Sequence, residues 1–176
     1  MERILTILSP FFEDPQRRFG IRELSRILKI NHTTVRQHLI RLKKEGYLEV
    51  EKEGLYSFYK IFLSRKTLNL KLYYNLEKIR MSGLVEEIVR KYDYPTIGIF
   101  GSYAIGMDYA DSDIDICILT SITNEVDLTK FEKKLGRKIS IHRFSEKSWS
   151  RLKKTNPNLV NNIANGIVLS GQMVLV

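Results

Sequence analysis

The residues from 97 to 119 form two short apolar runs, separated by a loop that contains glycines and aspartates. The first run ends in Gly101-Ser102, and the second opens with Asp113-Ile114-Asp115. Because strand side chains alternate between the two faces of a sheet, Asp113 and Asp115 should share one face, with isoleucines on the other. The pattern predicts two strands joined by a loop, with two carboxylates that can bind a divalent cation. Backbone N–H groups at the Gly-Ser turn can hold a phosphate.

The Gly101-Ser102 pair, ten further residues and then Asp113-Ile114-Asp115 resemble the signature of the DNA polymerase β-like nucleotidyltransferase superfamily, particularly its minimal single-domain members. The resemblance covers residues 80 to 176. It implies a small mixed sheet covered by helices. It also implies that Gly101 and Ser102 bind the triphosphate of an NTP, and that Asp113 and Asp115 are the catalytic ligands of Mg²⁺. An Asp-x-Asp pair alone is common at strand ends, so the assignment depends on its spacing from the Gly-Ser pair.

Relatives in this superfamily generally place a third carboxylate on a later strand, and in this sequence that position falls on Ser140. His142 is the next residue on the same face of the predicted strand 138–144. Two roles stay open for His142: it is either a base or metal ligand, or a structural residue. Asp108 and Asp111 are either substitute ligands or solvated loop acids.

Two functions therefore remain for the second half of the chain. One is Mg²⁺-dependent transfer of a nucleoside monophosphate from an NTP to an acceptor hydroxyl. The other is that of a catalytically inactive transcription regulator or antitoxin-like protein, whose second domain binds nucleotide or a protein partner. The resemblance to minimal family members, which often act beside a separate helical partner, suits either function.

Positive charge is concentrated in the first half of the chain. Residues 1–80 hold 17 Lys and Arg against 9 Asp and Glu, whereas residues 81–176 hold 12 against 11. This asymmetry predicts two modules, of which the first faces a polyanion. Charge that serves only the solubility of exposed helices is the alternative.

The basic half has the pattern of three helices followed by a β-hairpin. Apolar periodicity predicts a short first helix ended by the Pro10 and Pro15 region, a second over 21–28 and a third over 32–44, capped by Asn31. Alternation over 47–61 predicts the hairpin. The whole resembles a winged helix-turn-helix domain of prokaryotic transcription regulators, with residues 23–25 and 33–39 as the matching stretches.

The third predicted helix would read base edges and phosphates in the major groove of DNA. Its DNA-binding candidates are the outward-pointing residues Thr33, Thr34, Arg36, Gln37 and Arg41. Glutamates 49, 51 and 53 of the hairpin would repel phosphate, so dimerisation or partner docking through this domain stays open.

The predicted fold class is α+β, in three parts. Residues 1–64 form the winged helix, 65–93 a helical connector interrupted at Ser82-Gly83, and 94–176 the nucleotidyltransferase-like domain. An apolar stripe on the connector predicts a homodimer: Leu68, Leu72, Leu76 and Ile79. After residue 119 we expect a helix over 124–135, the strand 138–144, a helix over 156–164, and a closing strand or hairpin over 167–176.

Cellular location follows from what the sequence lacks. Cys117 is the only cysteine, which excludes an internal disulfide, and its apolar strand predicts a buried, inert thiol. No apolar run reaches the length of a membrane span, and the N-terminus lacks the form of a signal peptide. We therefore expect a cytoplasmic protein that binds DNA and nucleotide and does not bind membranes.

Overall fold

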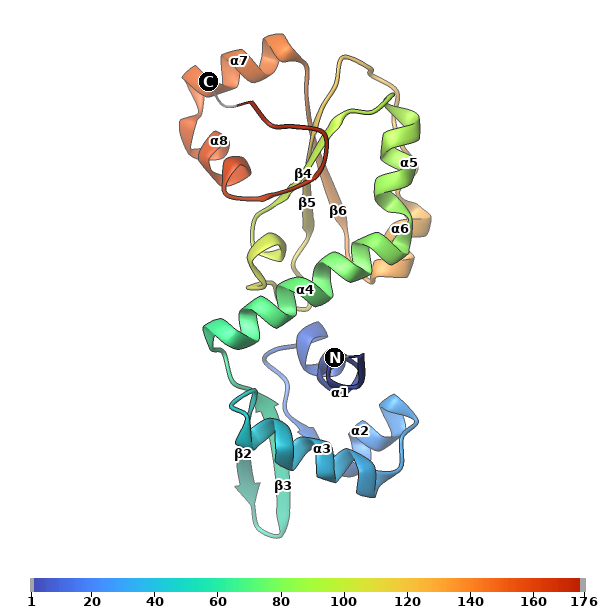
Figure 1. Ribbon diagram of the computed structural model, residues 1–176, viewed down its shortest axis with the longest axis vertical. Coiled ribbons are helices and arrows are strands. Elements are labelled where there is room, and N and C mark those ends of the chain that lie inside the picture. Colours follow the sequence, from blue (N-terminus) through green and yellow to red (C-terminus); the bar gives the residue numbers. More distant parts are fainter. Residues whose placement is uncertain (1, 175–176) are drawn as a thin grey trace. The chain divides into compact units, whose positions relative to one another are not determined.

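A computed structural model describes residues 2–174, and the chain divides into two compact units, Met1–Tyr74 and Asn75–Val176. The boundary falls inside helix α4 (Arg65–Ser82), which Figure 1 shows as one continuous ribbon. Helix α5 (Leu84–Lys91) follows it, so the predicted interruption at Ser82-Gly83 is confirmed. Ile79 of the predicted stripe is buried in the core of the second unit.

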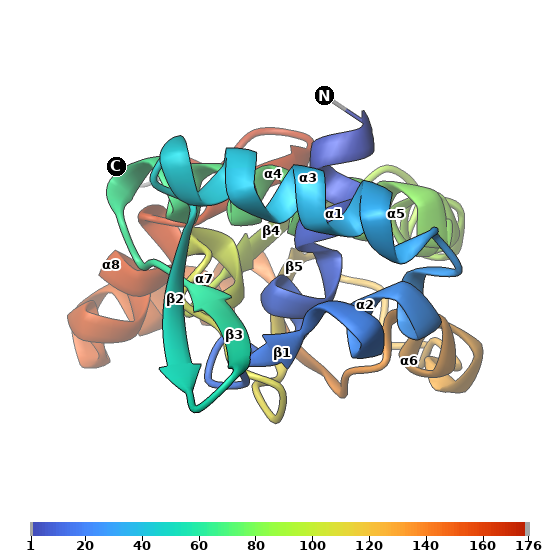
Figure 2. The ribbon, with the colours of Figure 1, turned by 90° about the horizontal axis from the view of Figure 1, so that it is seen from below.

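The first unit packs helices against a small antiparallel sheet. Its elements, in chain order, are α1 (Glu2–Glu13), β1 (Phe19–Gly20), α2 (Ile21–Leu28), α3 (His32–Lys44), β2 (Leu48–Glu53) and β3 (Tyr56–Ile61). The strand order is β1-β3-β2, so the predicted hairpin gains a third strand. Figure 2 shows α3 beside α1, with β2 and β3 extending from the end of α3. One core joins the helices to the sheet, with Phe11, Leu24 and Leu39 at its centre.

Helix α1 ends at Glu13, within the predicted region between Pro10 and Pro15, and it passes through Pro10 before it ends. Proline lacks the N–H that would bond to the carbonyl of Thr6, one turn earlier. The Ser9 hydroxyl donates to that Thr6 carbonyl at 2.9 Å. This side-chain bond satisfies the acceptor that Pro10 leaves open, which helps the helix to pass through the proline.

Helix α3 has the predicted bounds and the predicted cap. The backbone N–H of Thr33 donates to the Asn31 side chain at 2.9 Å, and Gly46 follows the helix with a φ of +76°. Val35, Leu39 and Leu42 are buried, as the apolar stripe predicts. The opposite face of the helix is exposed.

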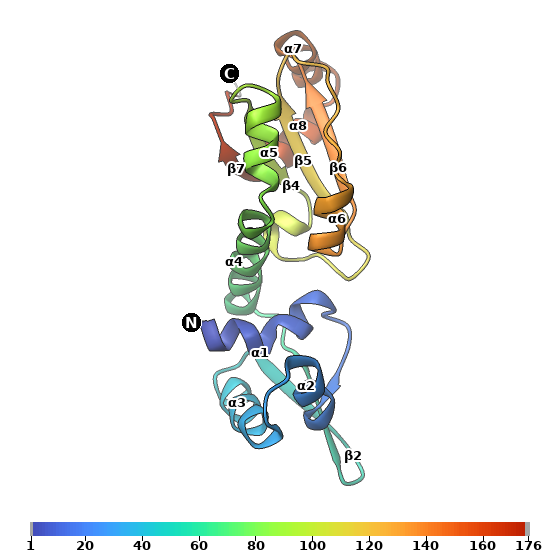
Figure 3. The same cartoon turned by 90° about the vertical axis from the view of Figure 1, so that its right-hand side faces the viewer.

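The second unit is a mixed four-stranded sheet between two groups of helices. Strands β4 (Thr96–Phe100), β5 (Ile114–Leu119), β6 (Ile139–Phe144) and β7 (Ile167–Ser170) have the order β6-β5-β4-β7 (Figure 3). Only β5 and β6 pair in parallel. Figure 1 shows α5 and α6 (Thr129–Leu135) on one side of the strands, and α7 (Glu146–Thr155) and α8 (Pro157–Ala164) on the other. The predicted α+β class is confirmed.

Each face of this sheet has its own core. Ile114, Ile116 and Ile118 point into the core that includes α5 and α6. Cys117 lies in the core under α7 and α8, where burial raises the pKa of its thiol to about 12. The thiol therefore stays protonated at neutral pH and is inert, as its position in the strand predicts.

One helix prediction in this unit differs from the structure, and one helix was not predicted. The helix expected over 124–135 begins only at Thr129, because the Asp127 side chain accepts a hydrogen bond from the Thr129 N–H and so favours a turn there. Helix α7, capped by Ser145, was not predicted. The closing segment forms strand β7, and its last residues, 175–176, lie outside the described part of the chain.

Candidate functional site

Strand β5 presents its two aspartates at the edge of the second unit where β4 ends. Asp113 precedes the strand and Asp115 is its second residue. Asp115 pairs with Phe100, the last residue of β4, and with Ser140 of β6. The isoleucines between and after the aspartates are buried on the opposite face. The alternation predicted from the sequence is therefore present, and the carboxylates lie on the face that also carries Ser140 and His142.

The Gly101-Ser102 turn lies directly against one of these carboxylates. Gly101 has a φ of +73°, and a Cβ on it would come within 2.6 Å of Asp115 Oδ2. Ser102 is the N-cap residue of η1 (Tyr103–Ile105), a single 3-10 turn, and its side chain makes no cap hydrogen bond. The fold thus brings together the two halves of the sequence motif. A phosphate here would be bound by backbone N–H groups rather than by the dipole of a long helix.

Gly101→Ala should weaken the binding of a divalent cation and should also lower the stability of the folded protein. The added methyl group must displace the Asp115 carboxylate, and its positive φ costs about 1–2 kcal/mol. The matched control is Gly46→Ala, whose φ is +76° and whose Cβ would meet no atom within 4 Å. Urea unfolding should show similar destabilisation in both variants. Mn²⁺ titration should show weaker binding only in Gly101→Ala, and equal binding would contradict the close approach.

Ser140 and His142 contact the aspartates but supply no third carboxylate. The Ser140 hydroxyl donates to Asp113 Oδ2 at 3.4 Å. His142 Nε2 lies 3.5 Å from Asp115 Oδ1, and the His142 ring meets Phe100 edge-on with centroids 5.1 Å apart. Within residues 2–174, no group of three His, Cys, Asp or Glu side chains could hold a metal ion. The acidic side chains of this site are therefore the aspartate pair alone among the described residues.

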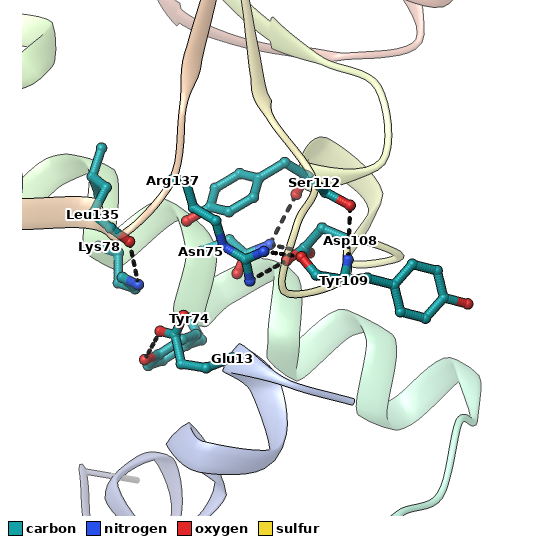
Figure 4. Close-up of polar contacts among 10 residues, drawn as sticks. Glu13, Tyr74, Asn75, Lys78, Asp108, Tyr109, Ser112, Leu135 and Arg137 are labelled. Atoms are coloured by element: carbon teal, nitrogen blue, oxygen red, sulfur yellow. Dashed lines mark hydrogen bonds and ion pairs between the residues drawn. The ribbon is translucent and has the colours of Figure 1, made fainter. Parts of the chain in front are cut away.

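The loop between the Gly-Ser turn and the aspartates is held by a buried polar network (Figure 4). Asp108 is only 1% exposed; Asn75 donates to its Oδ1 at 2.8 Å, and Arg137 lies 3.5 Å from its Oδ2. Asn75 also donates to the carbonyl of Tyr103, and Arg137 donates to the carbonyl of Tyr109. The expectation of a solvated Asp108 is therefore wrong.

Asp111, in the same loop, is exposed. The partners of Asp108 were missed because they lie 29 and 33 residues away in the sequence, and no local pattern marks them. The network connects helix α4 with three segments around the aspartates: the turn after Ser102, the loop before Asp113, and the residues just before β6. It therefore holds the loop in a defined position.

The DNA-binding candidates lie on the exposed face of α3. The exposed side chains are Thr33, Thr34, Arg36, Gln37 and Arg41. Arg41 Nε donates to Glu45 at 2.7 Å, which raises the pKa of the guanidinium. In the described part of the chain Arg36 forms no ion pair. Of the two arginines, Arg36 is thus the more available to a phosphate or a base.

Comparisons with known proteins identify both halves of the chain. The family model described as polymerase beta, nucleotidyltransferase, matches residues 84–172, just over half of the chain. The chain therefore belongs to the polymerase beta nucleotidyltransferase family. A second model, described as bacterial regulatory protein, arsR family, matches residues 14–50. The protein is a fusion of a helix-turn-helix domain of the DNA-binding kind with a nucleotidyltransferase-like domain, as the sequence motifs predict.

One solved structure that the chain matches is described as a possible transcriptional regulator from Methanosarcina mazei Go1. It is 20% identical over 49% of this chain and 78% of that chain, with a TM-score of 0.37. A search of curated proteins finds no match. Among residues 2–174, no helix is long and apolar enough to cross a membrane.

Proposed function

We propose that the second unit binds a nucleoside triphosphate together with Mg²⁺ and transfers the nucleoside monophosphate to an acceptor hydroxyl. The observation that carries the proposal is the packing of the Gly101 turn against the Asp115 carboxylate. In this proposal the backbone of the Gly101 turn binds the phosphates, and the two neighbouring carboxylates supply hard oxygen ligands for the ion. Mg²⁺ usually keeps several waters and takes one or two carboxylates plus substrate phosphates, so Asp113 and Asp115 fit this ion.

Each part of the site has a separate role in this proposal. The bound Mg²⁺ would neutralise charge on the phosphates. Asp113 and Asp115 hold the ion, while the N–H groups of the Gly101-Ser102 turn orient the phosphates. The buried Asp108 and Arg137 keep the loop between these parts in place. The Ser140 hydroxyl is not a base at neutral pH, so the site has no side chain at that position to accept the proton of the acceptor hydroxyl.

The hydroxyl at position 140 favours a second candidate function, which is binding without turnover. A regulator that senses a nucleotide or a protein partner needs the phosphate turn and the aspartates but not a third acid. Incubation with Mg²⁺ and each labelled NTP separates the two candidates. Pyrophosphate release or label transfer by the wild-type protein supports the enzyme, whereas NTP binding without either product supports the sensor.

Ser140→Asp should tighten the binding of a divalent cation by about tenfold, because it adds a third carboxylate beside Asp113. Isothermal titration with Mn²⁺ measures the change. Ser121→Asp, at an exposed position beyond the far end of β5, adds the same charge away from the site. Equal affinities of the two variants would contradict the assigned position of residue 140. Product formation that appears only in Ser140→Asp would support the non-catalytic function for the natural sequence.

We further propose that the first unit binds duplex DNA through α3 and that the protein regulates transcription. The supporting observations are the match to a regulatory helix-turn-helix family and the exposed polar face of the helix. Phosphate contacts supply much of the affinity of such domains, and side chains at base edges supply specificity.

Arg36→Ala should lower the affinity for duplex DNA by about tenfold, since it removes an available cation from the centre of α3. Arg41→Ala should have a smaller effect, because Glu45 already engages the Arg41 guanidinium. Fluorescence anisotropy with genomic fragments measures both variants. The matched control is Arg151→Ala, which removes the same charge from an exposed position in the second unit. Equal losses in all three variants would exclude α3 as the DNA-binding helix.

A further inference from the structure

Five charged side chains of the first unit form a continuous charge ladder, composed of Glu53, Arg18, Glu51, Lys60 and Glu49. We propose that this charge ladder holds Arg18 and Lys60 away from DNA phosphates and so lowers the affinity of the winged helix for DNA of arbitrary sequence. The proposal rests on the DNA binding proposed above. In this proposal, α2 and α3 make the contacts with DNA phosphates, and the hairpin weakens binding to DNA of arbitrary sequence.

The geometry of the hairpin places all five side chains on one face. The three glutamates alternate along β2, whereas Leu48 and Val50 pack on the core side. Glu49 is directly opposite Lys60 on β3. Arg18 directly precedes β1, which pairs with the other edge of β3. The charge ladder therefore joins β2 and β3 to the residue that precedes β1.

The ion pairs within the charge ladder are short. Arg18 Nη1 lies 2.5 Å from Glu53 Oε1 and 3.2 Å from Glu51 Oε2. Lys60 Nζ lies 2.8 Å from Glu51 Oε1 and 3.2 Å from Glu49 Oε1. These contacts raise the pKa values of Arg18 and Lys60 and lower that of Glu51. The Arg18 guanidinium also lies over the Phe58 ring, 4.8 Å from its centroid, which restrains its direction.

The charge ladder has more acids than bases, so it is anionic overall even when every pair is formed. A phosphate that approached Arg18 would have to displace the carboxylates of Glu51 and Glu53. Glu53 would then lose its partner in the charge ladder, and Glu51 would keep only Lys60. Half-exposed ion pairs are weak enough to exchange partners. The glutamates therefore compete with DNA phosphates for Arg18, and they do so without burying its guanidinium. The hairpin face therefore opposes the approach of DNA.

The cations of α2 and α3 are in a different situation. Several are exposed and form no ion pair within residues 2–174: Arg22, Arg26, Arg36, Lys43 and Lys44. They can meet phosphates without first leaving a carboxylate. Because each phosphate contact steepens the dependence of log affinity on log salt by about 0.9, the two sets of cations can be separated by experiment.

The test removes the two carboxylates that hold Arg18. Glu51→Gln/Glu53→Gln should bind a random-sequence duplex about tenfold more tightly than the wild type at about 50 mM salt, with a salt slope steeper by about one. Arg18→Ala alone should change the affinity by about twofold or less. In the double-glutamine background, Arg18→Ala should abolish the gain. Fluorescence anisotropy over a salt series measures all four proteins, and circular dichroism verifies their folding.

The matched control is Glu125→Gln/Glu146→Gln, which makes the same change in net charge at exposed positions of the second unit. An equal gain in this control would assign the effect to net charge and overturn the proposal. A loss of affinity on Arg18→Ala alone, as large as that of Arg36→Ala, would show that Arg18 already contacts DNA and would also overturn it. Binding of duplex by the wild type without a gain in the double-glutamine protein overturns this inference only. Failure of both proteins to bind any duplex overturns the proposed DNA binding as well.

Discussion

Asp113→Asn/Asp115→Asn is expected to lose Mg²⁺-dependent nucleotide binding by at least about 100-fold, which corresponds to about 2.7 kcal/mol. The substitution keeps the size of both side chains but removes the two negative charges that would hold the ion. Any pyrophosphate release should disappear with it. Titration with a fluorescent NTP analogue, with and without Mg²⁺, measures the loss.

Asp111→Asn is the control for this experiment, because Asp111 is an exposed acid of the same loop. Its affinity should stay within about twofold of the wild type. Nucleotide binding that survives in the Asp113→Asn/Asp115→Asn protein, with its Mg²⁺ dependence intact, would show that the ion is held elsewhere. The assignment of both aspartates would then be wrong.

Arg137→Met is expected to destabilise the protein by about 3–5 kcal/mol, because it removes a cation that lies 3.5 Å from the buried Asp108 carboxylate. The Tyr109 carbonyl also loses a donor. Urea unfolding followed by circular dichroism should show a lower midpoint. Lys138→Met, at the neighbouring exposed position, should leave the midpoint nearly unchanged.

A second variant separates the buried charge from the packing around it. Asp108→Leu/Arg137→Met replaces both members of the ion pair with apolar side chains, which often recovers the stability that the loss of one partner removes. We expect the double variant to be more stable than Arg137→Met alone. A double variant as unstable as the single one would indicate that the hydrogen bonds to Tyr109 and Asn75 carry the effect instead.

Local signals in the sequence predict those elements that are specified by a few neighbouring residues. Helix α3 has a side-chain cap at Asn31, an apolar stripe and a glycine after its end, and its bounds are as predicted. The alternation along β5 predicts which side chains are buried. The position of Ser140 beside Asp115 is also as predicted, because the strand period fixes both faces once the strands pair in register.

The features that were missed depend on partners that are distant in the sequence. Strand β1 has two residues, too few to show a period, and it exists because β3 provides an open edge. The burial of Asp108 needs Asn75 and Arg137, which come from an earlier helix and a later loop. No pattern in the loop itself distinguishes Asp108 from the exposed Asp111.

Helix α4 contributes side chains to two hydrophobic cores. Leu70 and Tyr74 pack against the core of the first unit, while Leu76 and Ile79 belong with the core of the second. A fragment that ends at residue 64 would therefore lack apolar side chains that cover the first core, and a fragment that begins at residue 94 would lack those of the second. Separate expression of either half should retain α4. A proline in the middle of this helix would damage both halves of the protein in one step.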